Sequence, residues 1–222
     1  MAERIADADV AAMRRCQQGD ASALDELVGR HQLSAVRIAY VLVQDRFIAE
    51  DIVQESFLLI YRKSHQFREG AQFTPWFHQV VINTARQHLR AAKRHPEQSL
   101  DLRQDSAASR AEDHHEHGES DPSAHMERVE TREAVLDILR RLTVKQREVL
   151  VLRYYCDYTD NEMARILGVP GGTVRWRLHA ALRAFERTMR RLHPWLAGSE
   201  QAPITPITPT ISGKLQEGAR HA

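Results

Sequence analysis

Residues 142–191 read LTVKQREVLVLRYYCDYTDNEMARILGVPGGTVRWRLHAALRAFERTMRR, and this stretch decides the fold of the C-terminal part of the chain. Two capping boxes, at Thr143 and at Thr159, predict two helix starts, since each threonine is followed three residues later by Gln or Glu. The run Gly168-Val-Pro-Gly-Gly172 should end the second helix, because glycine turns the chain and proline cannot continue a helix.

A third helix is expected from Thr173, with its apolar residues spaced to form one buried stripe. The stripe consists of Val174, Leu178, Ala181, Leu182 and Phe185, and the residues largely outside it are Arg175, Trp176, Arg177, His179 and Arg183. Two short helices, a glycine-containing turn and a basic second helix predict a helix-turn-helix that enters the major groove of DNA. An ordinary helical hairpin with a solvated basic face is the alternative, and Trp176 fits either a half-buried edge or a DNA contact.

Composition limits the class of protein. The 222 residues are 42% hydrophobic and 6% aromatic, with almost no alternating β-branched runs, so an all-α fold is expected. Two distant cysteines outside any CxxC motif suit a reducing cytosol and predict neither a zinc site nor another cofactor. A charged N-terminus and the lack of a long apolar run predict a cytoplasmic protein without membrane insertion.

The net charge of +1 hides an uneven distribution. Residues 98–125 contain seven acidic and two basic residues, whereas residues 126–196 contain nine acidic and 14 basic ones. The segment 96–125 has too few apolar residues to offset the entropy of ordering, so we expect a disordered linker, and its histidines lack the rigid spacing of a metal site. The repeated Thr-Pro of the tail favours an extended arm.

The N-terminal half is expected to be helical as well. Residues 7–30 should form two short helices separated at Gly19-Asp20, followed by a buried helix over 31–43 and another over 48–61. One side of this last helix is polar and carries Glu50, Asp51, Gln54 and Glu55. Spacing alone leaves open whether this side is a solvated acidic face or a docking face for a basic partner.

An aromatic-rich loop over residues 67–77 runs into a further helix that continues to about Arg94, with Thr74 as its expected N-cap and Pro75 in the first turn. The helix carries a basic stripe and, beside it, side chains able to hydrogen-bond base edges. The stripe is Arg86, Arg90, Lys93 and Arg94, the hydrogen-bonding residues are Asn83, Gln87 and His88, and the candidate base-stacking aromatics are Phe73 and Trp76. This pairing is expected where single-stranded bases stack and phosphates are neutralised, although core aromatics beside a solvated basic face remain the alternative.

Three stretches together resemble a bacterial sigma factor of the extracytoplasmic-function group, over about residues 10–95 and 126–192. AEDIVQESFLLIYR (49–62) is similar to the segment that grips the largest subunit of core RNA polymerase. TPWFHQVVINTARQHLRAAKR (74–94) is similar to the segment that melts and reads the minus-ten promoter element. Residues 142–185 are similar to the helix-turn-helix that reads the minus-thirty-five element.

The resemblance implies a fold and a set of partners. It implies a four-helix N-terminal domain (8–95), the flexible acidic linker (96–125), a helix-turn-helix domain (126–196) and a flexible tail (197–222). The implied partners are promoter DNA and the largest and second-largest subunits of core polymerase, with an anti-sigma factor as a further candidate. The implied function is to direct polymerase to promoters, without catalysis; the alternative is a regulator that binds duplex DNA by itself.

Roles follow by matching residues. Glu50, Asp51, Gln54 and Glu55 become docking residues, and Asn83 matches the promoter-reading Asn of the family. The loop from about Gln66 to Thr74 would hold a flipped-out base, and Thr173, Arg175 and Arg177 match the start of the recognition helix. Trp176, Ala181 and Gln87 depart from the usual family residues, which leaves the promoter sequence open.

Overall fold

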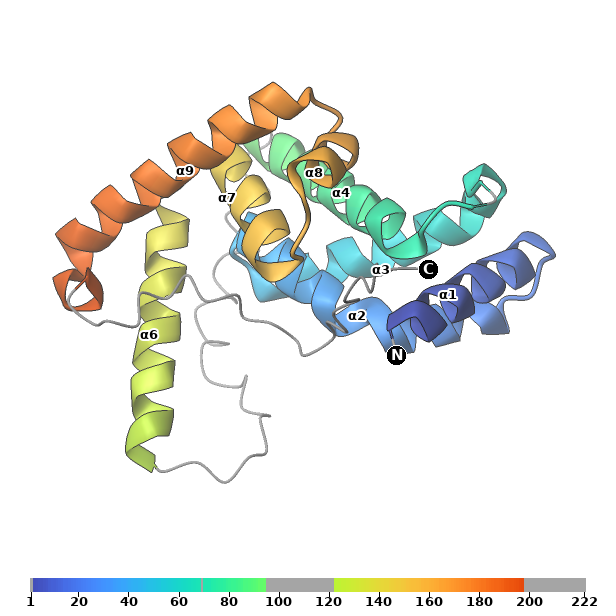
Figure 1. Ribbon diagram of the computed structural model, residues 1–222. Coiled ribbons are helices and arrows are strands. Elements are labelled where there is room, and N and C mark those ends of the chain that lie inside the picture. Colours follow the sequence, from blue (N-terminus) through green and yellow to red (C-terminus); the bar gives the residue numbers. More distant parts are fainter. Residues whose placement is uncertain (1, 69, 95–121, 198–222) are drawn as a thin grey trace, which may run out of the picture.

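The computed structural model describes residues 2–68, 70–94 and 122–197, and every regular element within these ranges is a helix (Figure 1). The prediction of an all-α fold is therefore confirmed. The predicted linker lies outside the described residues except for its last four positions. The predicted tail lies outside them from residue 198 onwards.

Four long helices and one short turn form the N-terminal domain. They are α1 (Ala2–Gln17), α2 (Ser22–Val43), α3 (Arg46–Arg62), the 3-10 turn η1 (Ser64–Gln66) and α4 (Phe73–Arg94). Phe77 of α4 is fully buried, and its ring centroid lies 4.6 Å from that of Phe57 and 5.5 Å from that of Phe73. Each large apolar side chain buried here stabilises the fold by roughly 1.5–3 kcal/mol relative to an exposed one.

The C-terminal domain contains the predicted helix-turn-helix. Its elements are α6 (Pro122–Arg140), α7 (Val144–Leu150), the π-helical turn η2 (Val151–Tyr155), α8 (Asp160–Leu167), α9 (Gly171–Leu192) and the 3-10 turn η3 (Pro194–Ala197). Both predicted capping boxes are present, at Thr143 and at Thr159. Gly168 ends α8 with a φ of +66°, a left-handed conformation that glycine adopts without strain.

Several helix boundaries differ from the sequence-based expectation, among them the start of α9 at Gly171 where Thr173 was expected. Helix α1 begins at Ala2, and α2 is a single helix that runs through His31. His31 is a buried polar residue whose Nε2 lies 2.7 Å from a carboxylate oxygen of the buried Asp9, so a polar position interrupts the apolar pattern without interrupting the helix. Helix α4 begins at Phe73, before the expected cap, and α6 begins at Pro122, where proline suits a first helical turn.

The two domains lie against one another, with α7 packed on α2 and α8 packed on α4 (Figure 1). Arg147 of α7 is buried and donates from Nη2 to the carbonyl oxygen of Leu42 at 2.7 Å. That carbonyl belongs to the last turn of α2, where no helical N–H is available to it. The hydroxyl of Tyr158 lies 2.9 Å from Nδ1 of His78 on α4, so both contacts place polar groups between the domains.

The buried aromatic centre gives a direct test of the fold. Phe77→Ala should lower the free energy of unfolding by about 3–5 kcal/mol, since it removes a large ring from the interior. Phe47→Ala, the same substitution at a side chain that is 50% exposed, should change it by less than about 1 kcal/mol. Urea unfolding followed by circular dichroism measures both. Equal effects of the two substitutions would contradict the packing described.

Candidate nucleic-acid interface

The C-terminal half of α4 presents cations to solvent. Arg90, Lys93 and Arg94 are exposed, and with Gln87 and His88 they border an open hollow of about 800 Å³. Three positive charges within about one and a half turns of one helix can neutralise neighbouring phosphates of a nucleic-acid strand. The structure thus brings three of the four predicted basic residues together on one accessible surface.

The fourth basic residue, Arg86, is engaged inside the molecule. Its Nε and Nη2 donate to the two carboxylate oxygens of Glu148 on α7 at 2.6 and 2.7 Å. Glu148 is only 1% exposed, and its hydrogen bond raises the pKa of the Arg86 guanidinium above the ordinary value. This two-pronged geometry is the strongest form of an arginine–carboxylate contact. Arg86 is therefore not available to a phosphate in this arrangement.

The predicted role of Phe73 in stacking bases is wrong for this structure. Its side chain is 2% exposed and packs among the rings of His31, Phe67 and Phe77. The ring of Phe73 thus anchors the aromatic loop in the protein core. Trp76 is half-buried, with its ring centroid 5.3 Å from that of Phe67.

A second cavity, of about 240 Å³, lies between η1 and the middle of α4. The indole of Trp76 and several amide side chains border it, so the cavity combines a flat apolar wall with paired donors and acceptors. Its polar residues are Lys63, Gln66, Gln79, Asn83, Thr84 and Gln87. Sequence reasoning did not identify Lys63 and Gln79, although Gln79 stands one helical turn before Asn83. The cavity suits one planar base whose edge is read by hydrogen bonds.

The polar side of α3 is accessible to solvent, and two of its four candidate docking residues contact other side chains of the protein. Asp51 and Gln54 are exposed, whereas Glu50 lies 3.0 Å from Arg46 and Glu55 lies 2.8 Å from His88. These contacts are at the surface, where polar pairs contribute little to stability, so a partner can displace them readily.

Two exposed apolar side chains lie on the same side of α3 as Asp51 and Gln54. Phe47 is 50% exposed and Leu58 is 51% exposed, and the spacing 47, 51, 54, 58 follows one face of a helix. The sequence analysis did not single them out, although their helical spacing from Asp51 and Gln54 is visible in the sequence. Acidic groups between exposed apolar ones are typical of a protein-binding surface.

The predicted recognition helix is oriented as expected. Val174 and Ala181 of α9 are buried, whereas Arg175, Trp176, His179 and Arg183 are exposed. Thr173 and Arg177 are half-buried at the edge of this surface. Trp176 is 68% exposed, which excludes the half-buried edge position for its ring. The surface combines cations with an exposed ring and is free to enter a groove.

Within residues 2–68, 70–94 and 122–197 no cluster of His, Cys, Asp and Glu has the arrangement of a metal site. None of the helices in the part of the chain that the structure describes combines the length and apolar character of a membrane span.

Two family models match the chain. The model described as Sigma-70 region 2 matches residues 27–95, and the model described as Sigma-70, region 4 matches residues 132–185. The first includes most of α2 and all of α3 and α4, and the second includes α7, α8 and most of α9. Both candidate nucleic-acid surfaces lie within these matches.

Several curated proteins are similar over most of their length. The RNA polymerase sigma-H factor of Pseudomonas aeruginosa is 31% identical over 180 residues, which are 81% of this chain and 93% of that protein. The ECF RNA polymerase sigma-E factor of Haemophilus influenzae is 30% identical, over 86% of this chain and 100% of that protein. The ECF RNA polymerase sigma factor SigM of Mycobacterium tuberculosis is 31% identical, over 79% and 81%.

Two solved structures share the fold at lower identity. CnrH, in complex with the cytosolic domain of CnrY, has a TM-score of 0.56 at 19% identity and covers 83% of this chain and 99% of that one. The sigma factor RpoE of Bartonella quintana, in complex with the anti-sigma factor NepR, has a TM-score of 0.54 at 21% identity and covers 75% and 96%. These likenesses support the helical architecture.

The buried His78 on the inner side of α4 predicts a pH dependence. Burial, and secondarily the charge of His31, lower the pKa of His78 to about 3, whereas a histidine in an unfolded chain titrates near 6.5. Between these values the unfolded chain binds a proton that the folded protein does not. The free energy of unfolding should therefore fall with decreasing pH below about 6.5, by up to roughly 1.4 kcal/mol per pH unit.

His78→Gln removes this titration and leaves an amide that can still pair with the hydroxyl of Tyr158. Urea unfolding at pH 7.5, 6 and 5 should show the variant losing less stability than the wild type as pH falls. Equal losses of stability in the variant and the wild type would show that His78 is not the source of the pH dependence.

Proposed function

We propose, because this chain belongs to the extracytoplasmic-function group of the sigma-70 family, that its N-terminal domain docks on core RNA polymerase and reads the minus-ten element while α9 reads the minus-thirty-five element. The chain functions as a sigma factor, which directs polymerase to promoters. This conclusion rests on the order of the two family regions, because region 2 precedes region 4 in one chain. The relatives match this chain over nearly their whole length. A stand-alone regulator is not favoured, since it would not need the first region.

The family acts as transcription initiation factors rather than as enzymes, so the bond-making step belongs to polymerase. The expected place of action is the bacterial cytoplasm, where chromosome and polymerase are. We further propose an anti-sigma factor as a partner. The complex of the RpoE sigma factor with NepR, which has a similar fold, supports this partner.

Docking is assigned to the exposed side of α3. Asp51 and Gln54 offer a carboxylate and an amide to a basic surface, and Phe47 and Leu58 add apolar contact on either side of them. An interface of this composition combines electrostatic steering with desolvated apolar contact. Glu50 and Glu55 would exchange their internal partners for polymerase groups.

Reversing the charge in this docking surface should prevent assembly. Asp51→Arg is expected to abolish co-purification with core polymerase, because it places a cation against a basic partner and leaves the helix intact. Glu130→Arg, the same change of charge at an exposed site on α6, is the matched control and should co-purify as the wild type does. Binding that persists in Asp51→Arg, at unchanged helical content, would show that this surface is not the docking site.

Promoter melting is assigned to α4 and the cavity beside it. Arg90, Lys93 and Arg94 would hold phosphates of the displaced strand, and the amides of Asn83 and Gln87 would read a base that enters the cavity against Trp76. Unstacking and unpairing a base costs a few kcal/mol, which capture in a pocket can offset. Reading of the minus-thirty-five element is assigned to Arg175, Trp176 and Arg177 at the start of α9, with His179, Arg183 and Thr173 beside them.

Binding both elements requires the two domains to separate. The names of the elements place them about 25 base pairs apart, which is roughly 85 Å of B-form duplex at about 3.4 Å per pair. A domain of this size is only about 30 Å across, and the domains are in direct contact through Arg86 and Glu148. The 27 residues between α4 and α6 could span at most about 90 Å when fully extended. We therefore propose that promoter engagement replaces Glu148 by phosphate as the partner of Arg86.

Weakening this contact should release Arg86 for DNA. Glu148→Gln removes the carboxylate charge at constant size, and the free protein should then bind a single-stranded minus-ten oligonucleotide about three- to tenfold more tightly, as fluorescence anisotropy would measure. Glu133→Gln, at an exposed site on α6, is the control and should bind as the wild type does. Unchanged binding by a folded Glu148→Gln protein would contradict the proposed exchange.

A further inference from the structure

The end of α1 holds the backbone of the loop formed by residues 64–67, which lies beside the cavity proposed to read a base. Gln17, the last residue of α1, donates both hydrogens of its amide nitrogen to carbonyl oxygens in and next to η1. Nε2 of Gln17 lies 2.9 Å from the oxygen of Ser64 and 3.0 Å from the oxygen of Phe67. These two carbonyls lie on either side of Gln66, which borders the 240 Å³ cavity.

The loop also has restraints of its own, among them the hydrogen bond that the N–H of Gln66 donates to the oxygen of Lys63 at 2.8 Å. The ring of Phe67 is buried against Phe73 and Trp76, and the N–H of Phe67 donates to the oxygen of Ser64 at 2.9 Å. Gln66 itself is exposed, and its side chain forms no hydrogen bond within the part of the chain that the structure describes. Its position therefore depends on the backbone that carries it, and Gln17 fixes that backbone from outside the loop.

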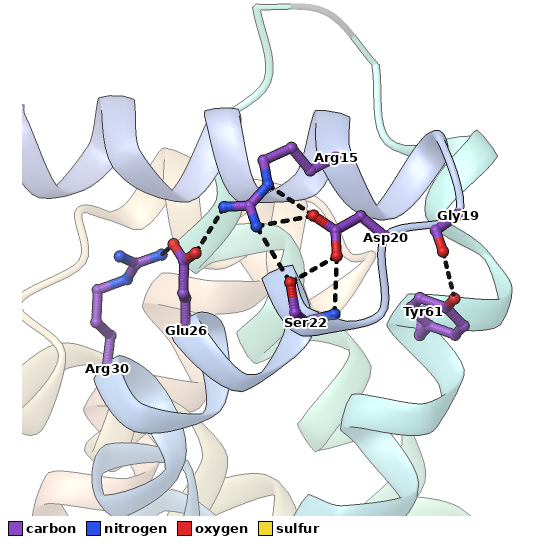
Figure 2. Close-up of polar contacts among 7 residues, drawn as sticks. All are labelled: Arg15, Gly19, Asp20, Ser22, Glu26, Arg30 and Tyr61. Carbon is purple, nitrogen blue, oxygen red and sulfur yellow. Dashed lines mark hydrogen bonds and ion pairs between the residues drawn. The ribbon is translucent and has the colours of Figure 1, made fainter.

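The end of α1 is itself held in place by a polar network at the α1–α2 turn (Figure 2). The guanidinium of Arg15 contacts Asp20 at 2.7 Å, Glu26 at 2.6 Å and Ser22 at 3.2 Å. Hydrogen bonds from Ser22 and then Arg15 lower the pKa of Asp20 to about 2, so this carboxylate stays charged at physiological pH.

The same turn is tied to the helix that leads into the loop. The hydroxyl of Tyr61 on α3 donates to the carbonyl oxygen of Gly19 at 3.4 Å, as Figure 2 also shows. Gln17 thus extends from a turn that is fixed on α2 through Asp20 and Glu26 and on α3 through Tyr61. A side chain anchored in this way can hold the loop against displacement when a base enters the cavity.

We infer that Gln17 is a positioning residue for promoter recognition, which sets the place of Gln66 and thereby the discrimination between bases in the cavity. This inference rests on the proposed function of the cavity. It extends the recognition machinery to α1, a helix that precedes the region matched by the family model.

The substitution that tests the inference is Gln17→Glu, which keeps the size of the side chain and removes both donors. A carboxylate would face two carbonyl oxygens and be repelled by them, so the loop should lose its support. Gln18→Glu makes the same chemical change one residue further on, at an exposed side chain, and is the matched control.

The readout is a ratio of affinities. The holoenzyme, formed from each variant and core polymerase, is titrated with single-stranded minus-ten oligonucleotides that carry either the preferred or a substituted base at the captured position. Gln17→Glu should lower the ratio of the two affinities by about fivefold, the equivalent of one lost hydrogen bond, while Gln18→Glu leaves it unchanged. A general loss of stability would weaken the binding of both oligonucleotides equally and leave the ratio of their affinities unchanged. An unchanged ratio in Gln17→Glu would overturn the inference.

A double-substitution cycle separates the inference from its premise. Gln66→Ala should lower the ratio as Gln17→Glu does, and the two together should lower it no further, because both act through one side chain. If Gln66→Ala lowers the ratio and Gln17→Glu does not, Gln17 has no positioning role. If Gln66→Ala leaves the ratio unchanged while Asn83→Ala lowers it, the cavity reads a base without Gln66, and the positioning role of Gln17 is overturned. If neither substitution lowers the ratio, the proposed function of the cavity fails as well.

Discussion

Helix α4 must be buried on two sides at once, and the rest of the structure is arranged around that constraint. One side inserts Phe77 into the N-terminal bundle, and the other places His78 and Arg86 against the C-terminal domain. Surface left for a nucleic acid is confined to the last two turns and to the narrow strip that borders the cavity. The helix that carries most of the candidate DNA contacts is thus also the helix on which both domains depend for packing.

Much of this architecture follows from local patterns that can be recognised in the sequence. The capping boxes at Thr143 and Thr159 satisfy the N–H groups of their own helix starts, so they function wherever the helix is placed. The stripe of α9 is equally local, because the 3.6-residue period determines which residues share a side. For this reason the recognition surface around Arg175 was predicted with its orientation, whereas its target sequence was not.

The features that escaped prediction depend on contacts between distant residues. Arg86 and Glu148 are 62 positions apart, and nothing near either one indicates the other. An aromatic residue in a loop has the same sequence pattern whether it stacks on a base or anchors the loop in the core, which is why Phe73 was misassigned. Nothing in the sequence near Gln17 indicates Gln66, and only the folded chain brings the amide of Gln17 to the carbonyl oxygens of Ser64 and Phe67, on either side of Gln66.

The chemistry of the contacts between the domains bears on the proposed separation of the two domains on a promoter. A buried ion pair loses much of its Coulomb attraction to desolvation, so the pairing of Arg86 with Glu148 adds less net stability than apolar side chains of similar volume would. The buried Arg147 donates to Leu42 and Leu139 but leaves its Nε without a hydrogen bond, and burial lowers the pKa of its guanidinium. Groups of this kind regain hydration or a phosphate partner when the domains part, whereas Phe77 and its neighbours would only lose contacts. The buried polar groups at the boundary therefore lower the free energy needed to separate the domains, whose apolar core is otherwise continuous across that boundary.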